Sequence, residues 1–146
     1  MSEQSMSITK VLTGFSTAHR AWWAESHCRH VHGYDRTFKI TLGCSSLERG
    51  WVYNFGGFKE IKRLLEDQFD HTTCIAQDDP YLGLFQRMHE LDLVDLRVMD
   101  NPGMEGAAQW VAELVERIVN EETSGRVFVE RVEAWENDKN SAVWTR

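Results

Sequence analysis

The spacing of apolar residues constrains the fold of this chain more than any other feature. Apolar and polar side chains alternate over residues 8–19, 35–43 and 126–136, and residues 141–145 form a further short extended segment. Alternation with a period of two is typical of strands that bury one face. Between the second and third segments the apolar spacing changes to three and four residues, which predicts helices.

Two helices are predicted in that central region. Asn54 offers an N-cap, and apolar residues follow it at helical spacing as far as Phe69. Residues 101–102, an asparagine followed by proline, predict a second helix start, and the polar residues 123–125 predict its end.

The segment between these two helices is less regular. Residues 70–80 are expected to form a polar loop, residues 81–90 a short helix and residues 93–99 a short extended piece. No internal repeat, low-complexity tract or linker interrupts the chain, so residues 1–146 are expected to form a single domain.

The order strand, strand, helix, helix, strand, strand predicts an α+β fold. Strands that follow each other closely pair antiparallel, so a four-stranded antiparallel sheet with both helices packed on one face is expected. Such a sheet leaves its edges exposed. Pairing of these edges into a symmetric ring would remove them, which predicts a homo-oligomer. A monomer whose edges are covered is the alternative.

Composition narrows the class of protein. The net charge is −7, from 16 basic and 23 acidic residues, and no basic stripe is present, so nucleic acid is an unexpected partner. No apolar run is long enough to cross a membrane, and the polar residues 1–10 lack a signal-peptide core, so a cytoplasmic protein is expected. Cys28, Cys44 and Cys74 form no CxxC pair and are expected to be free thiols.

A cluster of histidines is the main candidate for chemistry. On a strand, His30 and His32 would point to the same side, and His19 would end the first strand on the same side as Phe15 and Val11. If the first two strands pair, three imidazoles meet at one point. Three neutral imidazoles and an open position describe a catalytic zinc site, and zinc would polarise a substrate oxygen. A histidine-rich surface turn without metal is the alternative.

One carboxylate is also expected to point inward. Glu136 ends the third alternating segment on the same side as Phe128, Val132 and Ala134. An unpaired carboxylate is costly in such a place, so a ligand that pairs with it is plausible.

Six segments of the chain, in the same order, resemble motifs of the 6-pyruvoyl-tetrahydropterin synthase and 6-carboxy-tetrahydropterin synthase (QueD-like) family. The family motifs are F-x-A-A-H-R, C…H-G-H-N-Y, G-M-V-x-D-F-x-x-L-K, L-D-H-x-x-L-N, N-P-T-x-E and V-x-V-x-E-T…A-x-Y. The matching segments are residues 15–20, 28–34, 50–59, 69–73, 101–105 and 132–144. The resemblance implies the T-fold (tunnelling fold), which assembles into a barrel as a trimer or a dimer of trimers.

The resemblance also implies roles for single residues. His19 and the two histidines of the H-x-H motif would bind zinc. Cys28 would be the catalytic cysteine. Asp70 and His71 would form an acid–base pair that works with it. Two carboxylates are implied in substrate binding: Glu136 would anchor the pterin ring, and Glu105 would help to hold the ring or the helix start.

Two alignments of the second metal motif remain open. In the first, His30 and His32 are the two ligands and the loop after Cys28 is short. In the second, His32 is a ligand and Tyr34 replaces the other histidine, although a tyrosine with a pKa of about 10 is a poor neutral ligand. We favour the first alignment on ligand chemistry. Two substitutions, Asn54 and Asn137, and the length of residues 75–100 also depart from the family pattern.

The expected activity is the zinc-dependent conversion of 7,8-dihydroneopterin triphosphate to a 6-substituted tetrahydropterin. The favoured product is 6-carboxy-tetrahydropterin, on the route to 7-deazaguanines such as queuosine, and 6-pyruvoyl-tetrahydropterin is the other branch. A non-catalytic module that binds pterins or purines on the same fold is an alternative. A different T-fold enzyme of the cyclohydrolase type is another.

Overall fold

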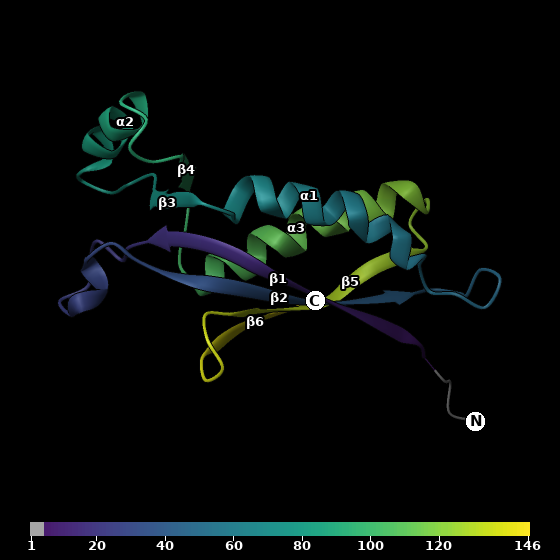
Figure 1. Ribbon diagram of the computed structural model, residues 1–146. Coiled ribbons are helices and arrows are strands. Elements are labelled where there is room, and N and C mark those ends of the chain that lie inside the picture. The colour runs from purple at the N-terminus through teal and green to yellow at the C-terminus, as the bar shows by residue number, and fades with distance from the viewer. Residues whose placement is uncertain (1–4) are drawn as a thin grey trace.

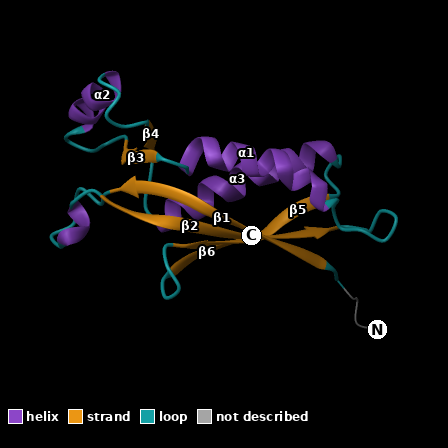
Figure 2. Cartoon of the chain, viewed as in Figure 1, coloured by secondary structure: helices purple, strands orange, loops and turns teal. Residues whose placement is uncertain are grey.

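The computed structural model describes residues 5–146 and contains one sheet with two helices lying across it (Figure 1). Helices α1 (Phe58–Phe69) and α3 (Met104–Glu122) lie side by side over one face of the sheet, and α2 (Leu82–Glu90) lies beyond one end (Figure 2). In the described residues the sheet has six strands in the order β4-β3-β1-β2-β5-β6. The strands are β1 (Ser7–His19), β2 (His32–Cys44), β3 (Thr72–Ala76), β4 (Leu96–Met99), β5 (Val127–Trp135) and β6 (Ser141–Thr145).

The predicted α+β fold is confirmed, and the sheet is larger than expected. Strands β1, β2, β5 and β6 are the four antiparallel neighbours that the alternation predicts. Strand β3 adds to the outer side of β1 in parallel, and β4 adds in parallel to β3. Pairing of the exposed sheet edges into a ring remains a prediction.

The prediction of a polar loop over residues 70–80 is wrong in its middle. Residues Thr72–Ala76 form β3, and all five side chains are buried. The reason is that this strand has neighbours on both sides and lies under helices, so it shows no alternation to detect. The hydroxyl of Thr72 bonds locally, since it donates to the carbonyl of Gln68 at 2.7 Å.

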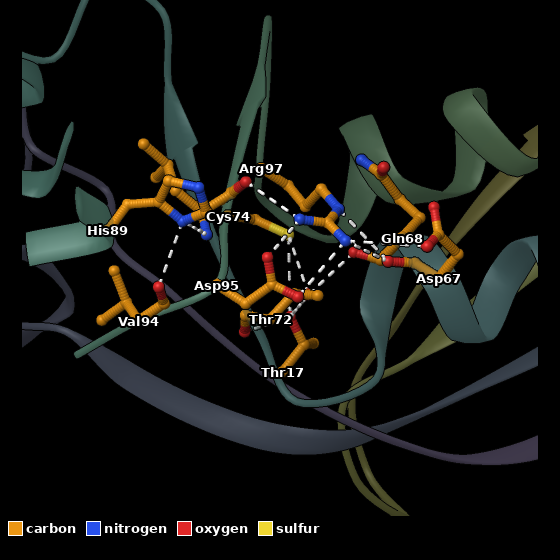
Figure 3. Close-up of polar contacts among 10 residues, drawn as sticks. Thr17, Asp67, Gln68, Thr72, Cys74, His89, Val94, Asp95 and Arg97 are labelled. Carbon is orange, nitrogen blue, oxygen red and sulfur yellow. Dashed lines mark hydrogen bonds and ion pairs between the residues drawn. The ribbon is translucent and has the colours of Figure 1, made fainter. Parts of the chain in front are cut away.

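Side-chain hydrogen bonds fasten the two added strands to the rest of the fold (Figure 3). The Thr17 hydroxyl of β1 lies 3.2 Å from the carbonyl oxygen of Thr72. Arg97 of β4 donates to the backbone carbonyl of Asp67, near the end of α1, at 2.9 Å and to the Asp95 carboxylate at 2.5 Å. The end of α1 and the strands that follow it are therefore held as one unit at the end of β1.

The core lies between the helices and one face of the sheet. The predicted apolar stripe of α1, which is Phe58, Ile61, Leu65 and Phe69, is buried throughout. It packs with the inner face of β2 and with the buried side of α3 in one hydrophobic cluster. Each fully buried side chain of this size contributes roughly 2 kcal/mol, so packing rather than local propensity holds the helices in place.

A β-bulge in β1 determines which face His19 occupies. Leu12 pairs with Phe38 but Phe15 pairs with Arg36, so β1 carries one extra residue there. Gly14 lies in this bulge with a φ of +88°. The bulge exchanges the two faces of the strand: Leu12 is buried before it, and Phe15 and then His19 are buried after it. The sequence expectation that Val11 shares a face with His19 is therefore wrong.

A second bulge does the same for Glu136. Thr41 pairs with Arg131 but Leu42 pairs with Val129, so Glu130 is the extra residue of β5. Val129 is buried before the bulge, and Val132 is buried after it. Glu136 follows β5 four residues after Val132 and so on the same side, which the bulge turns to the buried face that Val129 occupies. The two bulges together therefore turn His19 and Glu136 toward the helix-covered face.

No helix within residues 5–146 is both long and apolar enough to cross a membrane.

The first bulge gives a prediction about Gly14. A side chain at this φ is strained although no neighbouring atom lies within 4 Å of the added Cβ, so Gly14→Val is expected to cost about 1–2 kcal/mol of stability. Thr13→Val is the matched control, because Thr13 is exposed on the same strand with ordinary backbone. Thermal unfolding followed by circular dichroism measures both variants. Equal melting temperatures would contradict the prediction.

Candidate active-site cleft

A cleft of about 730 Å³ lies where β1 ends and β2 begins. This volume suits a small organic ligand. The cleft combines residues from the end of β1, the loop 20–31, the start of β2, the start of α3 and the turn between β5 and β6. Among the residues that line it are His19, Cys28, His32, Tyr34, Glu105 and Glu136.

Two of the predicted histidines face each other across the β1–β2 pair. His19, the last residue of β1, is the register partner of His32, the first residue of β2. Their ring centroids are 4.6 Å apart with the planes tilted by 51°. His19 is only 7% exposed, and His32 is half-buried. The predicted meeting of these two imidazoles is therefore present in the structure.

The third aromatic ring at this point belongs to Tyr34. It lies on the same side of β2 as His32, and its ring centroid is 5.5 Å from that of His32 and 6.0 Å from that of His19. His30 is elsewhere: its side chain is exposed and does not line the cleft. Tyr34, and not His30, completes the group formed by His19 and His32.

The reason for the position of His30 is the local backbone. Residues His27–Arg29 form a 3₁₀ turn, capped by the Ser26 hydroxyl, which accepts a hydrogen bond from the Cys28 N–H at 3.3 Å. Strand β2 starts only at His32, so the strand geometry that would place His30 and His32 on one side does not apply. The His30 carbonyl oxygen instead lies 2.7 Å from His32 Nδ1.

Arg36 is a site residue that sequence reasoning missed. It is fully buried on the face of β2 that carries Tyr34 and Phe38. Its Nη2 lies 3.0 Å from His19 Nδ1 and donates to the Pro102 carbonyl at 2.8 Å. The sequence does contain a signal for it: Arg36 lies two positions before Phe38, on the face that the alternation predicts to be buried. A charged side chain on a buried face is rare unless it has polar partners.

The pKa values of two cleft residues shift with their surroundings. Burial, the Arg36 charge and His32 together lower the pKa of His19 to about 3, so its imidazole is neutral at physiological pH. Burial and then the charge of Glu136 raise the pKa of Tyr34, so this side chain is a phenol and not a phenolate.

These residues do not fit the predicted zinc ion. A guanidinium only donates hydrogen bonds, so His19 Nδ1 must accept and the proton of this neutral ring is on Nε2. A histidine that ligates through Nε2 needs the reverse arrangement, with Nδ1–H donating to an acceptor. Tyr34 is a protonated phenol. Within residues 5–146, no three His, Cys, Asp or Glu side chains gather in a group that could hold a metal ion.

The other implied residues of the cleft are two carboxylates and a thiol. Cys28 is half-buried in the 3₁₀ turn and lines the cleft. Glu136 is half-buried, and Asn140 donates to its Oε1 at 3.2 Å, which orients the carboxylate at the mouth of the turn. Glu105 is exposed in the first turn of α3, where a carboxylate suits the helix dipole.

Asp70 and His71 are not in this cleft. The His71 side chain is 84% exposed, and its Nδ1 lies 3.0 Å from the Asp70 carboxylate. The backbone of His71 pairs with Ser16, three residues before His19 on β1, at a left-handed φ of +58°. Three residues of strand span roughly 10 Å, so the pair lies outside the reach of its own chain's cleft.

A buried ion pair fixes the loop that covers the cleft. Arg20 donates to both carboxylate oxygens of Asp79, at 2.7 and 2.9 Å, and to the carbonyl of Arg29 at 3.1 Å. Burial alone would raise the pKa of Asp79, but the hydrogen bonds from Arg20 and from the Tyr81 N–H outweigh it and lower the pKa. The turn after β3 therefore anchors the 3₁₀ turn that carries Cys28, a role that sequence reasoning did not assign to residues 75–100.

The fold and this cleft define an α+β protein of the T-fold class. A model of the family "6-pyruvoyl tetrahydropterin synthase" matches residues 7–146, so the chain belongs to that family. A Pyrococcus abyssi protein described as "Putative 6-carboxy-5,6,7,8-tetrahydropterin synthase" is 22% identical over 125 residues, which are 81% of this chain and 76% of that protein.

Solved structures show the same fold. An uncharacterized protein of Wolinella succinogenes, WS1659, is similar with a TM-score of 0.85, 24% identity and coverage of 99% of each chain. The 6-pyruvoyl tetrahydropterin synthase of Plasmodium vivax has a TM-score of 0.70 at 14% identity, again over 99% of each chain. That of Caenorhabditis elegans has a TM-score of 0.66 at 19% identity, over 98% of this chain and 96% of its own.

The ion pair gives a prediction about the stability of the cleft loop. The Asp79 side chain is fully buried, so Arg20→Ala would leave an unpaired buried carboxylate and is expected to cost about 3 kcal/mol. Arg87→Ala is the matched control, because Arg87 pairs with Glu90 on the exposed face of α2 and should cost less than about 0.5 kcal/mol. Urea unfolding measures both variants, and a similar loss for the two would contradict a structural role for Arg20.

Proposed function

We propose that the chain binds a pterin in this cleft and acts on the substituent at C6 of the ring. The observation that carries the proposal is the joint placement of Glu136, Cys28 and His32 in one cleft of suitable volume. A carboxylate accepts two parallel N–H bonds, which matches the amide–amidine edge of a pterin. With the ring held at Glu136, its substituent would extend toward the histidines and the Cys28 thiol.

The proposed substrate is 7,8-dihydroneopterin triphosphate, and the favoured product is 6-carboxy-tetrahydropterin. Similarity to the Pyrococcus abyssi protein supports this branch over the pyruvoyl one. In the reaction a base removes a proton from the hydroxylated side chain as triphosphate leaves. His32 is suited to this step. Its Nδ1 faces the His30 carbonyl oxygen, which only accepts, so the proton of the neutral ring is on Nδ1 and Nε2 keeps a lone pair that can take up a proton.

A second candidate is a non-catalytic module that binds pterins or purines. It is favoured by one observation, the presence of Tyr34 beside His19 and His32 where the catalytic zinc site would need a third imidazole. Zinc binding therefore remains a prediction, and the group formed by His19, His32 and Tyr34 disfavours it. Release of triphosphate on incubation with 7,8-dihydroneopterin triphosphate separates the enzyme from the binding module, and mass spectrometry of the pterin product identifies the branch.

Ring binding is tested at Glu136. Glu136→Gln keeps the shape but replaces one acceptor oxygen with a donor, so affinity for 7,8-dihydroneopterin should fall about 30-fold, equivalent to roughly 2 kcal/mol. Glu133→Gln is the matched control, because Glu133 lies on β5 shortly before Glu136, outside the cleft and near Lys39. Isothermal titration calorimetry measures the affinities. Equal affinities for the two variants would remove the support for a pterin.

The position of Asp70 and His71 leads to a proposal about assembly. Asp70 and His71 lie away from the cleft of their own chain, and the His71 side chain is exposed. A role beside Cys28 therefore requires the pair of one copy to serve the cleft of another copy in the proposed homo-oligomer, a trimer or a dimer of trimers. No sequence feature decides between the two ring sizes, and sedimentation measures them.

Mixing two inactive variants tests this arrangement. Cys28→Ala and His71→Ala should each be inactive alone, but co-refolding them at equal amounts should restore activity at about a quarter of the sites, since each site then draws two residues from independently chosen copies. A mixture of Cys28→Ala with Glu136→Gln is the control and should restore nothing if those two residues serve one chain's cleft. No recovery in the first mixture would contradict the shared site.

A further inference from the structure

A positive charge that does not come from a metal is buried behind the wall of the cleft, next to His19. The Arg36 guanidinium is fully buried, lies over the Phe69 ring at 5.5 Å and contacts His19. Its Nε and Nη1 have no hydrogen-bond partner among the described residues. A guanidinium is not deprotonated in proteins, so Arg36 is a cation although its burial is unfavourable for the charge. The Arg36 guanidinium is therefore a permanent cation in contact with His19, on the Nδ1 side of its ring.

The partners of the two imidazoles fix opposite tautomers. His19 Nδ1 faces an Arg36 nitrogen, which can only donate, so the proton of His19 is on Nε2. His32 Nδ1 faces the His30 carbonyl oxygen, which can only accept, so the proton of His32 is on Nδ1. The remaining nitrogen is therefore a hydrogen-bond donor in His19 and an acceptor in His32.

We propose that this cleft works without a bound metal and that His19 and His32 form a donor–acceptor pair for a hydroxyl group of the ligand. A hydroxyl can accept from His19 Nε2–H and donate to His32 Nε2 at the same time, which neither imidazole could do while ligating zinc. Arg36 is the positioning residue: it holds the His19 tautomer and supplies the charge that stabilises an oxyanion formed at that hydroxyl.

Tyr34 fits this arrangement better than it fits a metal site. Its ring centroid is 5.5 Å from that of His32 and 6.0 Å from that of His19, so the phenol offers a hydroxyl to the same ligand group. The identity of the ligand rests on the proposed function, whereas the metal content and the tautomers are properties of the free protein. Failure of the pterin assay and failure of this inference are therefore separate results.

Metal analysis of untagged protein tests the first half of the proposal. The wild type is expected to carry fewer than about one zinc per ten chains, and added ZnCl₂ should shift its melting temperature by less than about 1 °C. Stoichiometric zinc in the wild type that is lost in His32→Ala but kept in His30→Ala would overturn the proposal.

A double variant tests whether Tyr34 and Arg36 are what exclude the metal. Tyr34→His supplies a third imidazole, and Arg36→Gln offers an amide oxygen that can accept from His19 Nδ1–H. The pair of changes is expected to give about one zinc per chain, tetrahedral cobalt(II) absorption bands and a melting temperature raised by about 5 °C with zinc. Tyr34→His alone should bind zinc at least about tenfold more weakly, because His19 is still blocked. A folded double variant that takes up no zinc would contradict the exclusion.

The tautomers are measured directly, which keeps the proposal testable if the double variant does not fold. Long-range ¹H–¹⁵N spectra of ¹⁵N-histidine-labelled wild type distinguish protonation at Nδ1 from protonation at Nε2. His19 is expected as the Nε2–H form and His32 as the Nδ1–H form, with assignments from His19→Gln and His32→Gln. In Arg36→Met, His19 should no longer be held as the Nε2–H tautomer, so the spectrum should show both tautomers. Loss of packing alone would not produce this change. Nδ1 protonation of His19 in the wild type would overturn the proposal.

Discussion

The hydrogen bond from Arg36 to His19 is the interaction on which the rest of the cleft depends. The guanidinium joins three parts of the fold, because it bonds His19 at the end of β1, bonds the Pro102 carbonyl before α3 and packs on Phe69 at the end of α1. Its direction is fixed, since a guanidinium donates and never accepts. The chemistry of His19, and through it the choice between a metal ligand and a hydrogen-bond donor, follows from this one contact.

The sheet brings these groups together through two irregularities in its pairing. Because side chains alternate along a strand, one extra residue in β1 and one in β5 exchange the buried and exposed faces beyond each bulge. Without the first bulge His19 would face away from Arg36. Without the second, Val132 and Glu136 would lie on the face opposite to Val129. The shape of the cleft is thus a consequence of register and not of the loop sequences alone.

The sequence predicted the four antiparallel strands and the two long helices because each buries one face and so shows a clear period. It could not show β3, since a strand buried on both sides has no alternation, nor the bulges, which break the alternation on which the prediction rests. His19 and Glu136 were found from the alternation pattern and again from the family motifs, and Cys28 was assigned through a family motif. The wrong placement of His30 came from assuming strand geometry where Ser26 caps a 3₁₀ turn.

The two arginines at and behind the cleft differ in how their charges are balanced. Arg20 lines the cleft, but the Asp79 carboxylate accepts two of its hydrogen bonds and neutralises its charge. Arg36 has no carboxylate partner within residues 5–146. Burial lowers its pKa, and electrostatic interactions with Cys74, Glu136 and Tyr34 oppose this shift without outweighing it. A buried cation without a counter-ion costs stability unless an anionic group arrives. A ligand that gains negative charge beside His19 would supply that group, which couples ligand binding to the stability of the fold.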